Sequence, residues 1–544
     1  MRPIPKLLAP AAIGAAVALY PAPPGSRAAS SFEACVEQPS RQCLLTVAGA
    51  AATRTRLPAT RAYLFTLIAD AHAAADAVAD AKRAVDAAVD AMVEIDDPEA
   101  RLSALSSVAE RYRALGSDAA AEAALAEAAG LLGDGLAGDA GDQAFSRLMR
   151  MWHLAAPLAA LGPSDAFATT MERAVRAAET VAEPGPRSNA LVLIADLQAK
   201  LDPAAATGTF RRAIDAAADI ASPADRAAAL SAASVAALQA GAEGRALNTA
   251  KAALDAAGQV ESPSERARLT AIVILKLATF GDFTIGESDE RGVAACVADP
   301  TRGCLARHAA AAARATVPDR DRAVLLIYAA KARGASGGNP DAALADLAAA
   351  LAASEAVPVP NARSVLLRDI ARQQDALGDR PAARRTLAQL TRLTPTGAVE
   401  DAGINLLSRI HSLTAVAALS AEIDDPAAPA RFRQAVSLAE TAENAWRQAS
   451  ALRDIAVGQT ASDRTGAAET FALAVDAAIG VEFAESRANL LLEIADAAIE
   501  AGLPGVARTV APDVLSAIRR LDGLTDAAPY RARLALALLE AGLG

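Results

Sequence analysis

The stretch Arg487–Gly502 (RANLLLEIADAAIEAG) decides the fold of this 544-residue chain. Its apolar residues recur at the spacing of one helical face, at Leu490, Leu491, Ile494, Ala495 and Ala498. Gly502 stands where a helix of about four turns would need a left-handed residue to end. The stretch therefore predicts an amphipathic helix closed by a glycine.

The same pattern returns along most of the chain at intervals near 40 residues. Its first arginine recurs at Arg61, Arg101, Arg147, Arg187, Arg226 and Arg266, and then at Arg322, Arg363, Arg447, Arg487 and Arg531, with a further start near Gly403. A glycine follows fifteen residues later in seven cases, at Gly116, Gly162, Gly241, Gly281, Gly337, Gly378 and Gly502. This regularity predicts one helix of fixed length with the same cap each time.

Each such helix, called helix A, is followed by a second one. Ser222 and Ser262 precede proline and a carboxylate, which is the signature of a helix start, and Asp97 begins a variant of it. Alanine-rich segments between a glycine and the next start predict a helix B, as at 210–220, 246–257 and 471–479. The repeating unit is therefore helix A, turn, helix B, turn.

Two amphipathic helices cannot bury their apolar faces alone, so neighbouring units must stack. The repeat resembles the tetratricopeptide-like and HEAT-like α-solenoids, which implies an all-α superhelix of helix-turn-helix units that binds other proteins. The period near 40 exceeds the 34 residues of a tetratricopeptide repeat, and the Trp, Leu-Gly and Tyr signature of that repeat is missing here. No binding residue of any family is therefore assigned to this chain.

A larger duplication lies above the short repeat. Cys35 and Cys296 are 261 residues apart, as are Cys43 and Cys304, and Arg226 and Arg487. The sequence predicts two arrays, 34–282 and 295–544, joined by an acidic linker at 283–294. Residues 133–141 (GDGLAGDAG) predict another loop.

The first 29 residues predict a secretory signal peptide. Arg2 and Lys6 precede a fourteen-residue apolar run at 7–20, and small residues follow it. The run is shorter than the roughly 20 residues that span a membrane, although an uncleaved anchor is the alternative. We expect an exported protein, periplasmic or secreted, whose mature chain does not span the membrane.

Four cysteines form two matching pairs with eight-residue separations. A continuous helix would hold such residues about 12 Å apart, but Pro39 and Pro300 predict a corner at which the pairs can meet. We expect disulfides Cys35–Cys43 and Cys296–Cys304, as in exported proteins. A metal site or a redox-active pair is the weaker alternative.

The repeated arginines could form a ladder that binds carboxylates or phosphates: Arg61, Arg101, Arg187, Arg226, Arg266, Arg322, Arg363 and Arg487. A structural role is favoured. A cation at a helix N-terminus is unfavourable for the helix dipole, so each arginine is expected to pair with a carboxylate of the adjacent unit.

No catalytic or cofactor motif is present, and the chain is not expected to be an enzyme. His72, His153, His308 and His411 are far apart in sequence and match no metal-protease spacing. Met149, Met151 and Trp152 form a bulky cluster that fills a core or lines a local groove. No metal or cofactor site is predicted.

The predicted function is an exported scaffold that binds another envelope protein or a peptide. A formal net charge of -11 argues against a nucleic-acid partner. One alternative is a glycan-binding accessory protein, which would need exposed aromatic platforms, and the chain has only 2 Trp and 5 Tyr. The other is an all-α enzyme with a pocket inside the superhelix, which would need histidines or carboxylates of different units to converge.

Overall fold

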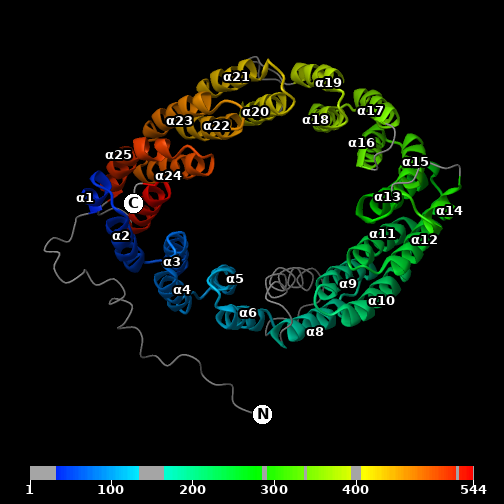
Figure 1. Cartoon of the computed structure of the whole chain (residues 1–544), viewed down its shortest axis with the longest axis horizontal. Coiled ribbons are helices and arrows are strands. Elements are labelled where there is room, and N and C mark those ends of the chain that lie inside the picture. The colour runs from blue at the N-terminus through cyan, green and yellow to red at the C-terminus, as the bar shows by residue number, and fades with distance from the viewer. Residues whose placement is uncertain are drawn as a thin grey trace, which may run out of the picture. The chain divides into compact units, whose positions relative to one another are not determined.

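The computed structural model describes residues 32–133, 165–284, 291–335, 340–393, 406–521 and 526–542. Within these ranges every regular element is an α-helix, and the helices form successive antiparallel pairs (Figure 1). The chain is an all-α protein of the solenoid class, as the sequence predicts. None of the helices in these ranges combines the length and apolar character needed to cross a membrane.

The A helices are α3 (Pro58–Ala73), α5 (Pro98–Ala114), α9 (Pro184–Ala199), α11 (Pro223–Gln239), α13 (Pro263–Phe280), α16 (Asp319–Ala335), α18 (Pro360–Ala376), α20 (Leu406–Glu422), α22 (Ala445–Gln459), α24 (Ala484–Glu500) and α26 (Ala528–Glu540). The B helices are α4 (Val78–Met92), α6 (Asp118–Gly133), α8 (Asp165–Glu179), α10 (Pro203–Ala218), α12 (Glu243–Gly258), α17 (Pro340–Glu355), α19 (Arg380–Leu393), α21 (Ala428–Glu440), α23 (Arg464–Ile479) and α25 (Pro504–Leu521). The cysteine-bearing helices are α1 (Phe32–Glu37), α2 (Arg41–Arg54), α14 (Val293–Ala298) and α15 (Arg302–Arg314).

The predicted start signals of the A helices are confirmed. The Ser222 hydroxyl accepts a hydrogen bond from the Asp225 amide at 3.3 Å, and the Asp97 carboxylate accepts one from the Ala100 amide at 3.0 Å. These bonds satisfy amide groups that have no partner within the first helical turn.

Several of the predicted glycine caps are also confirmed. Gly116, Gly241, Gly378 and Gly502 have φ values of 67°, 73°, 85° and 73°. This left-handed conformation strains a residue that has a Cβ, so glycine at these positions sets the length of helix A.

The expectation of a left-handed cap is wrong at Gly281, where φ is -81° and ψ is 140°. After α13 the chain does not turn into a B helix. It continues extended to Phe283, a core residue that is 7% exposed, and a Cβ at Gly281 would collide with the Phe283 ring. Glycine is needed here for space, whereas the other caps need its backbone freedom. Gly162 and Gly337 lie outside the described residues.

The B helices are longer than the sequence predicts, because they begin several residues earlier, at Pro203, Glu243 and Arg464. They pack against the A helices mainly through alanine: Ala250 and Ala253 of α12 are fully buried, as is Ala213 of α10. Small side chains let neighbouring helices approach closely, and the buried apolar area drives the stacking.

The chain divides into two compact units. Unit 1 comprises residues 1–128, 396–418 and 427–544, and unit 2 comprises 129–395 and 419–426. Each unit therefore combines the end of one predicted array with the start of the other. In a solenoid each repeat contacts only its neighbours, so compact units need not coincide with duplicated sequence.

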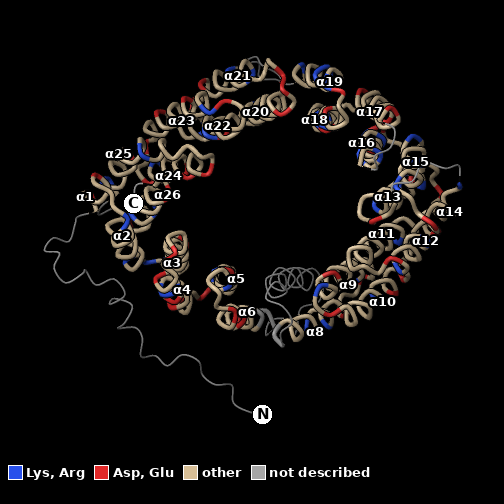
Figure 2. Tube along the Cα trace, viewed as in Figure 1, with Lys and Arg blue, Asp and Glu red and all other residues tan. Residues whose placement is uncertain are grey.

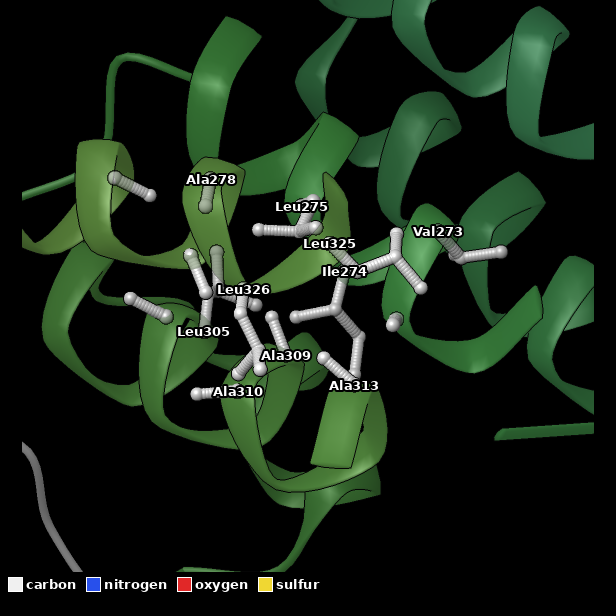
Figure 3. Close-up of a cluster of buried hydrophobic side chains, with 14 of the residues drawn as sticks. Val273, Ile274, Leu275, Ala278, Leu305, Ala309, Ala310, Ala313, Leu325 and Leu326 are labelled. Carbon is white, nitrogen blue, oxygen red and sulfur yellow. The ribbon is translucent and has the colours of Figure 1, made fainter. Parts of the chain in front are cut away.

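Within unit 2, the end of the first array packs directly on the start of the second. Helix α13 packs against α15 and α16, and Figure 3 shows Ile274, Leu275, Leu305 and Leu326 meeting in one apolar cluster. The ends of the predicted linker take part in this packing. Phe283 belongs to the cluster, and the Arg302 amide donates to the Thr284 carbonyl at 3.1 Å.

Within unit 1, the two ends of the chain meet in the corresponding way. Helix α26 packs against α2 and α3, and α1 lies beside α25 and α26 (Figure 1). The Arg56 amide donates to the Asp526 carboxylate at 3.0 Å, and the Arg531 guanidinium lies 5.7 Å from the Phe32 ring centroid. Because α2 and α15 occupy positions 261 residues apart, the joint between α26 and α2 is equivalent to the joint between α13 and α15.

Some sequence predictions fall outside the described residues. These are the signal peptide at 1–29, most of the loop at 133–141, the helix start at Arg147, the cluster Met149, Met151 and Trp152, and His153.

Candidate functional site

The arginine ladder lies at the turns between B and A helices. Arg226 donates to the Ile220 carbonyl at 3.0 Å, Arg322 to Thr316 at 2.9 Å, and Arg487 to Val481 at 2.8 Å. Each acceptor lies six residues earlier, at the C-terminal end of the preceding helix. Carbonyl groups there lack helical partners and carry the negative end of the helix dipole, so the guanidinium closes the turn.

The other ladder residues have related environments. Arg61, Arg187 and Arg266 also donate to carbonyls that precede them, those of Thr55, Ala182 and Gly258 at 3.3, 3.3 and 3.5 Å. Two carboxylates pair with ladder arginines, Glu94 with Arg61 and Glu127 with Arg101, but both belong to the helix B segment of the arginine's own unit and not to the adjacent unit as expected. Arg363 is half-buried, with no hydrogen bond to its Nε among the described residues. The ladder arginines that donate to these carbonyls therefore link the start of helix A to the end of the preceding helix.

Replacing Arg487 with alanine is expected to lower the free energy of unfolding by about 1–2 kcal/mol, because the carbonyls of Val481 and Glu482 lose a charged donor. Arg519→Ala, at an exposed position of α25, is the matched control and should change it by less than about 0.5 kcal/mol. Urea unfolding followed by circular dichroism measures both. Equal effects of the two substitutions would contradict the capping role.

A second charged feature runs across the A helices of unit 1. Helices α22, α24, α26, α3 and α5 pack side by side in that order. Their polar side chains join neighbouring helices: Arg453 to Glu493 at 2.7 Å, Arg533 to Asn489 at 2.8 Å and to Asp496 at 2.9 Å, and Arg111 to Asp70 at 2.7 Å.

Carboxylates lie nine residues after the first arginine of the repeat on four of these helices, at Asp496 on α24, Glu540 on α26, Asp70 on α3 and Glu110 on α5. Because α26 has 13 residues and α24 has 17, Glu540 lies two residues before left-handed Gly542, as Glu500 does before Gly502. Glu500 follows one turn after Asp496. We call these five residues the acidic stripe, and Asp and Glu are red on α24, α3 and α5 in Figure 2.

The acidic stripe is electrostatically unfavourable at its centre. Burial raises the pKa of Glu540, and the negative charges of Asp496, Asp70 and Glu500 raise it further. Burial also raises the pKa of Asp496, although Arg533 opposes this rise. Among the described residues, no hydrogen bond or ion pair reaches the carboxylates of Glu540 and Glu500. Asp496 and Asp70 have arginine partners, so the negative charge that the described residues leave unpaired is that of Glu540 and Glu500.

In unit 2, the position nine residues after the first arginine of each repeat carries different side chains. It carries Asp196 on α9, Val235 on α11, Leu275 on α13, Lys331 on α16 and Arg372 on α18. Arg372 forms an ion pair with Glu422 at 3.0 Å. The duplicated A helices therefore present different charges, and the acidic stripe belongs to unit 1.

Two open grooves lie elsewhere. One of about 480 Å³ in unit 2 lies between the starts of α16 and α18, and it is lined mainly by Pro318, Val357, Val359 and Val365. The other, of about 490 Å³ in unit 1, is lined by residues of α20 and α21 together with Thr441, and Arg433 is its charged residue. Neither groove contains a histidine or a pair of carboxylates, so neither shows the convergence that the all-α enzyme hypothesis requires.

The described histidines are separate from one another. His72 is buried, and burial lowers its pKa. His411 lies 3.2 Å from the Asp454 carboxylate on the A-helix face. In the described ranges, the exposed aromatic side chains are also dispersed, on different helices or turns, at Tyr63, Phe280, Tyr328, Trp446 and Phe483. They do not form the row of platforms that glycan binding would need.

The cysteines of each pair lie at disulfide-bonding distance, as the sequence predicts. Cys35 bonds to Cys43 and Cys296 to Cys304, with Cα–Cα distances of 5.7 and 6.1 Å. Each pair closes a corner between a short helix and a longer one. His308 lies beside the second pair, a contact not predicted from the sequence, although the four-residue spacing of Cys304 and His308 places them on one helical face.

The described part of the chain defines an α-helical repeat protein whose charged face lies on the A helices of unit 1. No protein-family model and no curated protein matches the chain. Solved structures that resemble it include yeast Tom70 (11% identity, TM-score 0.28, covering 85% of this chain and 95% of that one). Another is Ton1535 from Thermococcus onnurineus NA1 (16% identity, TM-score 0.26, covering 71% and 97%). A third is the apo form of the quorum sensor NprR from B. thuringiensis (11% identity, TM-score 0.25, covering 69% and 99%). These low scores transfer no function.

Proposed function

We propose that this protein is a non-enzymatic scaffold that binds a segment of another protein rich in Lys and Arg on the A-helix face of unit 1. The acidic stripe carries this proposal, and Glu540 is its central residue. A repeat array presents a long surface made of many helices, which suits an extended partner.

The physical reason for a cationic partner is the negative charge of Glu540 and Glu500, which no side chain of the described residues pairs with. Like charges gathered around Glu540 destabilise the folded protein, and a protein tolerates such a cost at a functional surface. An incoming ammonium or guanidinium group would supply the missing counter-charge. Glu540 is exposed, and near a protein surface one such contact at 4 Å has a gross Coulomb energy of about 4 kcal/mol, which salt weakens.

Glu540→Lys tests the proposal with a fluorescently labelled peptide of alternating Lys and Ala as the probe. We expect affinity at low salt to fall at least tenfold, because the substitution places a cation where the probe binds. Asp476→Lys on the exposed side of α23 changes the net charge equally and serves as the control, with an expected change below about twofold. Fluorescence anisotropy measures both. Equal losses would show that only the overall charge matters, and the proposed site would be wrong.

Probe affinity should also fall as the pH is lowered through the raised pKa values of Asp496 and Glu540. The cation binds the ionised carboxylates, so protonation competes with it. For folding alone the sign is opposite, since a raised pKa means that ionisation costs the folded state free energy as the pH rises. Glu540→Gln should therefore weaken the pH dependence of binding while leaving the protein as stable as before or more stable at neutral pH. Anisotropy titrations between pH 4 and pH 7 would check this, and an unchanged pH profile would contradict it.

We further propose that the protein is exported and acts in the cell envelope. The basic and apolar N-terminal sequence supports export, and so do two cystines, which persist in oxidising compartments. N-terminal sequencing of the protein recovered from an envelope fraction should begin near residues 28–30. A mature protein that keeps Met1 in the cytoplasm would contradict export.

The natural partner is to be found by crosslinked recovery of the tagged protein from its own cell envelope, followed by mass spectrometry. We expect one dominant protein that is lost with Glu540→Lys and retained with Asp476→Lys. Retention on purified cell-wall polysaccharide without any protein partner would favour the glycan-binding alternative.

A further inference from the structure

The second cysteine pair differs from the first by one nearby side chain. The two Sγ atoms of Cys296 and Cys304 and one ring nitrogen of His308 all lie within 4.8 Å of one another. Both cysteines are buried, at 1% and 0% exposure, while His308 is half-buried. At the position equivalent to His308, 261 residues earlier, the first pair has Val47.

The local fold explains how the three side chains meet. Cys304 and His308 are four residues apart on α15, so they lie on the same helical face. Cys296 comes from α14, across a corner that Thr301 stabilises by accepting a hydrogen bond from the Cys304 amide at 3.2 Å. The geometry of the site therefore does not depend on a long loop.

The histidine is also oriented. Its Nε2 lies 2.7 Å from the Arg291 carbonyl oxygen, which can only accept, so Nε2 carries the proton and Nδ1 keeps its lone pair. Arg307 donates to the same carbonyl at 2.9 Å. Histidines that bind metals commonly donate their other ring N–H to a backbone carbonyl in this way.

We propose that, when the Cys296–Cys304 disulfide is reduced, Cys296, Cys304 and His308 bind one Zn²⁺ ion. Two thiolates and an imidazole are ligands that zinc prefers, and three protein ligands leave a fourth position for water. Ligand atoms around tetrahedral zinc are about 3.5–4 Å apart, so small side-chain rotations close the site once the sulfurs separate.

The chemistry balances with a dithiol as reductant. Two thiol–disulfide exchanges transfer two electrons and two protons to the protein, forming two cysteine thiols while the dithiol becomes a disulfide. Zinc binding then displaces two protons from the thiols. The guanidinium of Arg307, which lies 3.2 Å from His308 Nε2, favours thiolate over thiol nearby. The same residues thus form a cystine under oxidising conditions and a metal site under reducing ones.

The test compares two full-length double variants that each keep one cysteine pair. Cys35→Ser/Cys43→Ser keeps the pair beside His308, and Cys296→Ser/Cys304→Ser keeps the pair beside Val47. Both are reduced with dithiothreitol, desalted without oxygen and titrated with Zn²⁺ against a chromophoric chelator. For the first variant we expect the protein to take one equivalent of zinc from the chelator and to release about two protons. The second variant should take up no zinc in competition with the same chelator.

His308→Val in the first variant should weaken zinc binding at least tenfold. The midpoint of thermal unfolding gives an independent readout, because zinc should raise it only for the reduced variant that keeps His308. Uptake by the oxidised protein, equal uptake by the two double variants, or unchanged affinity after His308→Val would each overturn the proposal.

Discussion

Replacing Asp346 with alanine is expected to lower the free energy of unfolding by about 3–5 kcal/mol. The Asp346 side chain lies on α17 and is fully buried, with 0% exposure. Arg333 of α16 contacts one carboxylate oxygen at 2.7 Å, and Arg314 of α15 contacts the other. Removing the carboxylate would leave two guanidinium groups without their counter-charge, and Arg333 is itself 15% exposed.

Two further variants make this prediction specific. Glu355→Ala, at the exposed end of the same helix, should change the free energy of unfolding by less than about 0.5 kcal/mol. The first array has Ala84, His72 and Thr53 at the positions of Asp346, Arg333 and Arg314, since one extra residue precedes α17 and shifts its matches to 262 residues. The triple variant Asp346→Ala/Arg333→His/Arg314→Thr should recover part of the loss, because no buried guanidinium is then left without its counter-charge. Denaturant unfolding measures all three. A loss below about 1 kcal/mol for Asp346→Ala would contradict the buried ion pair.

Leu44→Ala is the second substitution with a large expected effect. Leu44 lies on α2, which packs against α26 near the other end of the chain, and it is fully buried. Truncating a buried leucine costs about 2–5 kcal/mol through lost burial and a residual cavity. We expect a loss in this range in thermal or denaturant unfolding of the full chain.

Leu305→Ala is the matched comparison, since Leu305 lies 261 residues after Leu44, on α15, and is also fully buried. The two substitutions should destabilise the protein to a similar extent if the joint of α26 with α2 is as well formed as that of α13 with α15. A large effect of Leu305→Ala together with none of Leu44→Ala would show that the chain ends do not pack together in solution.

Much of the fold could be predicted because local signals agree with one another. Ser222 and Gly241 mark the two ends of α11, and both caps form as expected. The turn at Pro300 brings Cys296 and Cys304 together, as their spacing predicts. Such features depend on a few neighbouring residues, so one sequence is enough to infer them.

The partners of the arginines could be predicted only in part. Arg61 and Arg101 do pair with carboxylates, although of their own units and not of the adjacent ones, and Arg226 and Arg487 bind backbone carbonyls. In the sequence, each arginine stands at the N-terminus of its own helix, where a cation is unfavourable. In the structure the preceding helix ends beside it, where a cation is favourable.

The acidic stripe and the contact between the chain ends were not predicted. Asp70 and Glu540 are 470 residues apart, and no local pattern shows that α3 and α26 are neighbours. The duplication contained an indirect signal, because each array ends in a helix that fits the start of an array. That duplication does not show whether the last helix of the second array packs on the start of the first, because such a contact depends on packing in three dimensions.

The packing of α2 on α26 has a consequence for how the protein is made. Helix α2 leaves the ribosome long before α26, because Arg54 and Ala528 are 474 residues apart. At about 5–20 residues per second, α2 waits roughly half a minute to two minutes for its partner. During this time the face of α2 that packs on α26 in the finished protein has no partner, and α2 carries the buried residues Leu44 and Leu45. The nascent chain therefore carries an unpartnered helix until α26 emerges, and a chaperone that shields such segments would protect it from aggregation.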